Sequence, residues 1–202
     1  MNPISPSQVS GKSSVGRHLI IIVVMFLAVL LRLVVYTIST IQQAKSQAIL
    51  IDMAGRQRML LQQHLNEILL TSQGITASYS ETRALIVSTL RALMEGGPVV
   101  VDTDQGQLRT IAAVPTADMV SKLEEQRGGF DQIVSAADDF LMVSADHPEA
   151  SGKLDALRVL NLKVIETADE VVKQLNGYSE DSLTSMMKWE TLIAVCVGVF
   201  GF

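Results

Sequence analysis

The chain has 202 residues, a formal net charge of −5 and a single cysteine, and 48% of its residues are hydrophobic. The acidic balance argues against a nucleic-acid partner, because phosphate backbones are bound by clustered lysines and arginines. A single cysteine excludes a disulfide framework and a thiolate metal site. The high hydrophobic content instead indicates a protein associated with a membrane.

The hydrophobic excess is concentrated near the N-terminus. Residues 19–36 are apolar except for Arg32, and a membrane-spanning helix needs about 20 such residues. We therefore predict a cytoplasmic tail over residues 1–17 and a transmembrane helix over residues 18–36. A cleaved signal peptide is the alternative, but the run is long for one and no cleavage motif follows it.

A second apolar run follows Glu190, and we interpret residues 191–202 as the start of a second transmembrane helix that continues further. Lys12 and Arg17 precede the first span, whereas no acidic residue occurs before Asp52. Basic residues favour the cytoplasmic side of a membrane. Residues 37–190 should therefore face outward, and a cytoplasmic module should follow the second span.

The outward region has apolar residues at spacings of three and four, which predicts helices. The first helix should leave the membrane without a break, and Gly96, Gly97 and Pro98 should end the second. The remaining predictions are a second helix over about residues 80–95, an irregular connection over 99–115, a third helix from about 116 and a fourth from about 152. This pattern predicts an all-α fold, an antiparallel four-helix bundle between two transmembrane helices, with the first and last helices continuous with the membrane spans.

Two stripes run along the first helix. One has the alternating spacing of coiled coils and consists of Ile41, Ala44, Ala48, Ile51, Gly55, Arg58, Gln62, Leu65 and Leu69. The other consists of Leu50, Met53, Ala54, Leu60, Leu61 and Ile68. Two stripes fit a helix that packs against its own bundle on one side and against a second subunit on the other, so we expect a homodimer.

Gly55 and Arg58 lie three residues apart and share a helix face, whereas Arg56 is about 200° from Arg58 around the helix. An arginine among aliphatic side chains is destabilising unless it is paired, and no acidic residue lies between Asp52 and Glu67. Glycine also lowers helix stability by about 1 kcal/mol relative to alanine. We interpret Gly55 as leaving room for an anion that Arg58 holds through two parallel hydrogen bonds.

Other interpretations stay open for these residues. Arg58 could pair with a carboxylate from another helix, such as Asp138, Asp139 or Glu166. Arg56 could be solvated or form a salt bridge to another helix. Gln62 lies one turn beyond Arg58, where it could donate to an anion or could fix the register of a coiled coil.

The sequence indicates no catalytic chemistry. The acids Asp169 and Glu170 are adjacent rather than one helical turn apart, so we interpret them as a solvated face rather than an acid–base pair. His64 has no partner at a metal-binding spacing and no nearby nucleophile. We therefore expect no enzyme activity within these residues, no metal and no cofactor.

The segment IDMAGRQRMLLQQHL, residues 51–65, resembles the signature of PilJ-type sensor domains of methyl-accepting chemotaxis transducers. It is also similar to the P-box of the nitrate/nitrite sensor kinases NarX and NarQ. The part shared with both is Ala54-Gly55-x-x-Arg58-Met59, and Arg56 and Gln57 match the PilJ-type version. A weaker resemblance covers residues 41–185.

This resemblance implies a homodimeric receptor in a bacterial inner membrane whose periplasmic domain binds nitrate or nitrite between the paired first helices. It also implies signalling to a cytoplasmic module, either a chemotaxis transducer or a histidine kinase. The alternative is a ligand-free dimerisation or partner-sensing module of a pilus-linked transducer. The predicted ligand-binding residues are Arg58, Gly55, Ala54, Gln62 and Arg56.

The sequence departs from the family pattern at two places. The family commonly continues with Ser-Gln-Arg after Met-Leu, but Leu61, Gln62 and Gln63 stand there, so a second basic residue is lost. Phe130 occupies a position where the family has a tryptophan. The first departure bears directly on anion binding, because the lost residue would add positive charge to the same helix.

Overall fold

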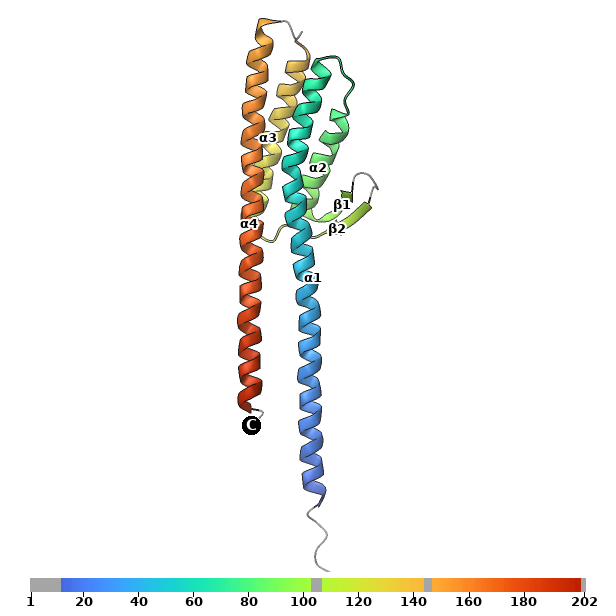
Figure 1. The fold of residues 1–202 in the computed structure, drawn as a ribbon, viewed down its shortest axis with the longest axis vertical. Helices are drawn as coiled ribbons and strands as arrows, with labels where there is room; N and C mark the ends of the chain where they lie inside the picture. The colour runs from blue at the N-terminus through green and yellow to red at the C-terminus, as the bar shows by residue number, and fades with distance from the viewer. Residues whose placement is uncertain (1–11, 103–106, 144–146, 201–202) are drawn as a thin grey trace, which may run out of the picture. The chain divides into compact units, whose positions relative to one another are not determined.

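The computed structural model describes residues 12–102, 107–143 and 147–200, and these form four helices and two strands (Figure 1). In chain order the elements are α1 (Lys12–Ser72), α2 (Tyr79–Glu95), β1 (Gly97–Asp102), β2 (Gln107–Ile111), α3 (Ala117–Leu141) and α4 (Pro148–Phe200). The predicted helical character is confirmed. The chain divides into two compact units, residues 1–44 and 45–202, which are described separately.

The first unit contains the N-terminal part of α1. This stretch is long and apolar enough to cross a membrane, and none of its most apolar window is buried inside the protein. Length and composition alone would also admit a signal sequence, so the first transmembrane helix stays a prediction. Residues 1–11 of the predicted cytoplasmic tail lie outside the described residues. At the other end of the chain, α4 is helical as far as Phe200, and residues 201–202 of the predicted second span lie outside the described residues.

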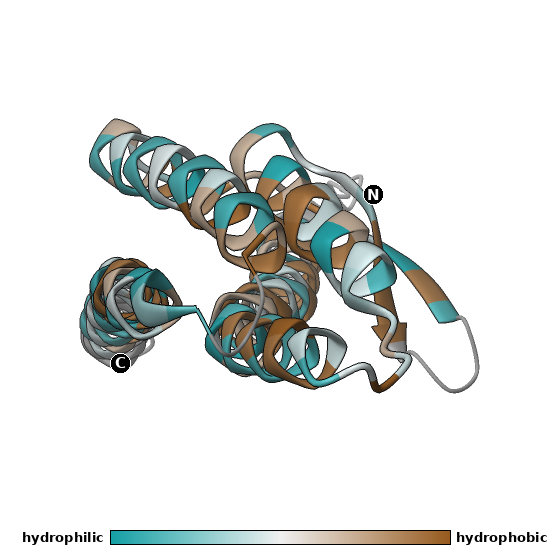
Figure 2. Cartoon of the chain, turned by 90° about the horizontal axis from the view of Figure 1, so that it is seen from above, coloured by the Kyte–Doolittle hydropathy of each residue, from teal (hydrophilic) through white to brown (hydrophobic). Residues whose placement is uncertain are grey.

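In the second unit, consecutive helices run in opposite directions (Figure 1) and contribute to one hydrophobic cluster. Figure 2 looks along the helices from above and shows hydrophobic and hydrophilic ribbon alternating around them. The largest fully buried aliphatic and aromatic side chains are Met53, Leu61 and Ile68 of α1, Ile86, Leu90 and Leu93 of α2, Leu123, Phe130 and Ile133 of α3, and Leu157 of α4. Burial of these apolar groups is the main favourable contribution to folding.

The two stripes of α1 have different environments. All six residues of the stripe from Leu50 to Ile68 are buried in the core. The stripe from Ile41 to Leu69 is less buried. Its exposed residues are Ile41, Ala48, Arg58 and Gln62, and its half-buried residues are Ala44, Ile51, Gly55, Leu65 and Leu69. Ile51, Leu65 and Leu69 pack against the edge of the core, so this second face is only partly covered within its own chain. The expected partner subunit stays a prediction.

Helix α2 ends at Gly96, whose φ of 77° lies in the left-handed region that favours glycine. Its backbone N–H donates to the carbonyl of Ala92 at 2.9 Å, which closes the last turn. A Cβ at Gly96 would lie 3.2 Å from the backbone nitrogen of Ala113, so this close approach also favours glycine. The predicted helix end at Gly96 is therefore confirmed.

The predicted irregular connection over residues 99–115 is wrong for most of its length. Strands β1 and β2 pair antiparallel, with Val99 opposite Arg109 and Gly97 opposite Ile111. Consecutive valines at the start of this segment suit a pleated strand, and Val99 and Ile111 are buried. The fold is therefore helical with an added β-hairpin rather than purely all-α.

Helices α3 and α4 pack closely along their length. Thr116 caps α3 by accepting a hydrogen bond from the backbone N–H of Met119 at 3.3 Å, as the predicted start near residue 116 requires. A Cβ added at Gly129 of α3 would lie 2.6 Å from Cγ2 of Val164 of α4. Glycine therefore permits the close approach of these two helices. Helix α4 begins at Pro148, four residues before the predicted start, because proline suits the first turn of a helix.

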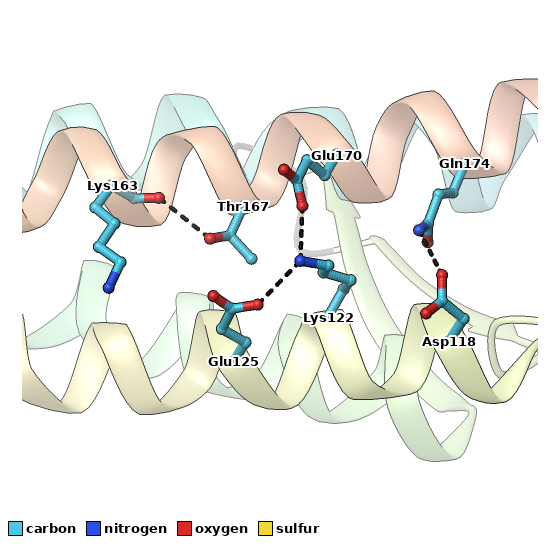
Figure 3. A network of polar contacts seen from close by, with 7 residues as sticks. All are labelled: Asp118, Lys122, Glu125, Lys163, Thr167, Glu170 and Gln174. Carbon is cyan, nitrogen blue, oxygen red and sulfur yellow. Dashed lines mark hydrogen bonds and ion pairs between the residues drawn. The ribbon is translucent and has the colours of Figure 1, made fainter.

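Polar contacts flank this packing on the α3–α4 surface (Figure 3). Lys122 of α3 lies 2.9 Å from Glu170 of α4 and 3.1 Å from Glu125 of its own helix. Hydrogen bonds and charge from Glu170 and Glu125 raise the pKa of Lys122 above its ordinary value. The side-chain amide of Gln174 donates to Asp118 at 2.6 Å, and Nζ of Lys153 donates to the carbonyl of Asp139 at 3.2 Å, so polar contacts also connect the two helices elsewhere along their length.

Candidate functional site

An open depression lies beside α1, between the hairpin and α4. Its volume is about 850 Å³, and it is lined by Ile51, Asp52, Gly55, Arg56, Arg58, Met59, Val101, Gln107 and Val172. Three of the predicted ligand-binding residues, Gly55, Arg56 and Arg58, are brought together here. Arg56 and Arg58 share this depression although they lie far apart around the helix, because their long side chains reach round it.

Arg58 differs from its prediction. Its Nη1 lies 2.6 Å from Oδ1 of Asp169 on α4, and the side chains of Arg58 and Asp169 are 47% and 37% exposed. The expectation of a buried guanidinium without a carboxylate partner is therefore wrong. The alternative that Arg58 pairs with an acidic residue from another helix is confirmed. The acidic residue is Asp169, however, and not Asp138, Asp139 or Glu166.

Arg56 is half-buried and contacts the hairpin. Its Nη1 donates to the backbone carbonyls of Val100 and Val101 at 2.9 and 2.8 Å. These bonds join residues 44 and 45 positions apart and connect α1 to β1. Neither a freely solvated arginine nor a salt bridge to another helix describes this contact, because the acceptors are main-chain carbonyls.

The other predicted residues contribute unequally. A Cβ at Gly55 would meet no atom within 4 Å, so the glycine face is open. Ala54 is buried in the core and does not line the depression. Gln62 is exposed further along α1 and also lies outside the lining. Of the predicted ligand-binding residues, Gly55, Arg56 and Arg58 therefore line the depression, and Ala54 and Gln62 do not.

The depression of one chain has a balanced charge. Arg56 and Arg58 supply two positive charges, whereas Asp52 in the lining and Asp169 beside Arg58 supply two negative ones. A single copy therefore offers an anion little net attraction. A two-fold axis would bring the same four charges from a second copy, so dimerisation by itself would leave this balance unchanged.

Sequence reasoning missed Asp169 and the hairpin residues Val101 and Gln107 as neighbours of this site. Asp169 was interpreted as solvated because an adjacent acid pair gives no periodic signal, but Asp169 contacts Arg58 and Glu170 contacts Lys122. The contacts with the hairpin depend on strand pairing over a loop, for which the local sequence gives no signal.

Two polar side chains of the signature face the core instead of the depression. Gln57 is buried, and its Nε2 donates to the carbonyl of Ile86 on α2 at 3.4 Å. His64 is 2% exposed and its ring centroid lies 5.4 Å from that of Phe130. Burial lowers the pKa of His64 below its ordinary value, although contact with the backbone of Tyr79 and the charge of Glu67 oppose this shift.

No protein-family model matches this sequence, and no curated protein does. Among solved structures, the ligand binding domain of the P. aeruginosa nitrate receptor McpN is similar, with 14% sequence identity and a TM-score of 0.49 over 64% of this chain and 94% of that chain. A similarity at this level assigns neither a ligand nor a function to this protein. The resemblance to PilJ-type and NarX/NarQ sensor domains stays a prediction from the sequence.

Proposed function

We propose that residues 37–190 form the periplasmic sensor domain of a receptor in a bacterial inner membrane, built as an antiparallel four-helix bundle between two transmembrane helices. In this proposal two copies pair through α1 and hold a small oxyanion, with nitrate first and nitrite second, between their Arg58 side chains. The signal passes to a cytoplasmic module of the chemotaxis-transducer or histidine-kinase kind.

The observation that carries this proposal is the second face of α1, which packing within one chain covers only in part. Ile51, Gly55 and Arg58 lie on this face and line the depression. Apart from the adjacent backbone of α1, no described residue has an atom within 4 Å of a Cβ added at Gly55, so packing among the described residues does not explain a glycine in the middle of this helix. A ligand or a second copy of α1 would explain it.

The ion pair of Arg58 is compatible with exchange for a ligand. Salt bridges between exposed side chains stabilise a protein by about 0–1 kcal/mol, and both partners here are more than one-third exposed. An oxyanion held by two guanidinium groups would gain charge-assisted hydrogen bonds, each stronger than a neutral one. Replacement of Asp169 by such an anion would remove one polar contact between α1 and α4, the two helices that lead toward the membrane, while the contact between Gln47 and Ser179 would remain.

Calorimetric titration of the full chain in detergent micelles with sodium nitrate tests this proposal. We expect saturable heat for the parent protein and at least tenfold weaker binding for Arg58→Ala, since charge-assisted bonds contribute about 1.5–3 kcal/mol each. Arg91→Ala is the matched control, because Arg91 also forms an exposed ion pair, with Glu95 at 3.0 Å, but lies on α2. Absence of heat for the parent, or equal binding by Arg58→Ala, contradicts the proposal.

The second candidate is a ligand-free dimerisation or partner-sensing module, as in a pilus-linked transducer. The pairing of Arg58 with Asp169 favours it, because this arginine then has a counterion within its own chain. Analytical ultracentrifugation with and without nitrate separates the two candidates. A dimer that is independent of nitrate and insensitive to Arg58→Ala favours the second one.

A further inference from the structure

Val99 and Ile111 bury one side of the hairpin in the core, and polar contacts attach it to the rest of the described residues at two further places. At its base, Gly96 leads directly from α2 into β1, and after β2 the backbone N–H of Val114 donates to the carbonyl of Leu93 at 2.8 Å. Further along β1, Arg56 donates to the carbonyls of Val100 and Val101. Hydrogen bonds with an ionised donor are stronger than neutral ones, so Arg56 is the principal polar contact between α1 and the hairpin among the described residues.

This attachment forms one side of the depression. Val101 accepts from Arg56 and lines the depression, and Gln107, paired with Asp102 at the start of β2, lines it as well. The same depression contains Gly55 and Arg58 on α1. The position of Gln107 relative to Arg58 therefore depends on how firmly the hairpin is held against α1.

We propose that Arg56 is a positioning residue that fixes the hairpin as the second wall of the ligand site, and that Gln107 in this wall contacts the ligand and contributes to its selection. This inference rests on the proposed function for the presence of an anion. Arg56 acts through the backbone of β1 rather than by gripping the ligand. The amide group of Gln107 is a neutral hydrogen-bond donor, which suits an oxyanion whose charge is already balanced by arginine.

Two measurements on the full chain in detergent micelles test this inference. Hydrogen exchange reports the protection of residues 97–102 and 107–111, and calorimetry reports nitrate affinity. We expect Arg56→Ala to lose protection in the hairpin but not in α3, and to bind nitrate at least fivefold more weakly although Arg58 is intact. Arg56→Lys should restore part of both properties, since a lysine can donate to one of the two carbonyls. Arg91→Ala should change neither.

Gln107→Ala tests the ligand contact of Gln107 separately from the attachment of the hairpin by Arg56. We expect it to weaken nitrate binding while the hairpin remains protected, because the backbone carbonyls that Arg56 contacts are unchanged. If Arg56→Ala does not fold, Arg56→Lys and Gln107→Ala test the inference instead. Both variants keep a side-chain donor at residue 56 that can reach the carbonyls of Val100 and Val101.

The outcomes distinguish this inference from the proposed function. Nitrate binding by the parent together with unchanged affinity in Arg56→Ala or Gln107→Ala overturns the inference and leaves the proposed function intact. No nitrate binding by the parent overturns the proposed function and the role of Gln107 together. In that case hydrogen exchange still tests whether Arg56 holds the hairpin against α1. Unchanged protection of the hairpin in Arg56→Ala would refute this role.

Discussion

The guanidinium of Arg58 on α1 lies 2.6 Å from the carboxylate of Asp169 on α4, and both groups are partly exposed to solvent. This contact joins the two longest helices of the protein. It gives Arg58 a counterion within its own chain, and it makes Asp169 a competitor for any anion that Arg58 would bind. The first prediction follows from this competition.

Asp169→Asn should strengthen nitrate binding, because it removes the carboxylate that competes for Arg58. An exposed pair contributes about 0–1 kcal/mol, so the gain in affinity should reach about fivefold at most. Asp155→Asn is the matched control, since it makes the same charge change on the same helix beside a different arginine, Arg158. Equal gains in both variants, measured by calorimetry, would assign the effect to net charge instead of competition.

Gly55→Ala should weaken nitrate binding while it stabilises the protein. Alanine favours a helix over glycine by about 1 kcal/mol, and a Cβ at Gly55 would lie more than 4 Å from the atoms of the other described residues, the adjacent backbone of α1 apart. Gly177→Ala on α4 also enters open space and should raise the melting temperature without changing the affinity. A Gly55→Ala protein with parental affinity would show that the ligand does not occupy the space beside this glycine.

Gly129→Ala should destabilise the protein, whereas Gly128→Ala should not. The new Cβ of residue 129 would lie 2.6 Å from Cγ2 of the buried Val164, and a valine in a helix has little freedom to change its rotamer. Overpacking typically destabilises a core by about 1–3 kcal/mol. Gly128 has open space, so thermal unfolding of the two variants should shift in opposite directions, and a shared direction would contradict the close approach of α3 to α4.

The stability of the protein should fall as the pH is lowered below about 6.5, through His64. Burial lowers the pKa of this residue in the folded protein below its ordinary value of 6.5, so the unfolded chain takes up the proton first. The contribution of neutral His64 is therefore fully present above pH 6.5 and is lost as the pH falls from 6.5 through the lower pKa of the folded protein.

Urea unfolding of the parent and His64→Leu at pH 7.5 and at pH 5.5 measures this dependence. The leucine variant should lose less stability between the two conditions than the parent does. His147→Gln, at an exposed position where the ring accepts from the backbone N–H of Glu149, serves as the control for the loss of a histidine. A pH dependence that is unchanged in His64→Leu would remove His64 as its source.

The helices could be predicted from the sequence because their determinants are local. Apolar side chains at spacings of three and four place Leu123, Phe130 and Ile133 on one face of α3, and this face is buried. The end of α2 could be predicted as well, because it depends on the positive φ of Gly96, a backbone conformation that glycine favours. The hairpin was not predicted, since pairing of β1 with β2 depends on a register across a loop rather than on the composition of either strand.

The two faces of α1, one of which bears Gly55 and Arg58, could be read from the amino-acid sequence, because the position of a residue around a helix follows from its number. The contacts of these side chains became known from the folded chain: Arg58 pairs with Asp169, and Arg56 donates to the carbonyls of β1. The physical reason is that a long charged side chain reaches partners several ångströms from its own helix. Which partner lies within that reach depends on how α1, the hairpin and α4 pack together.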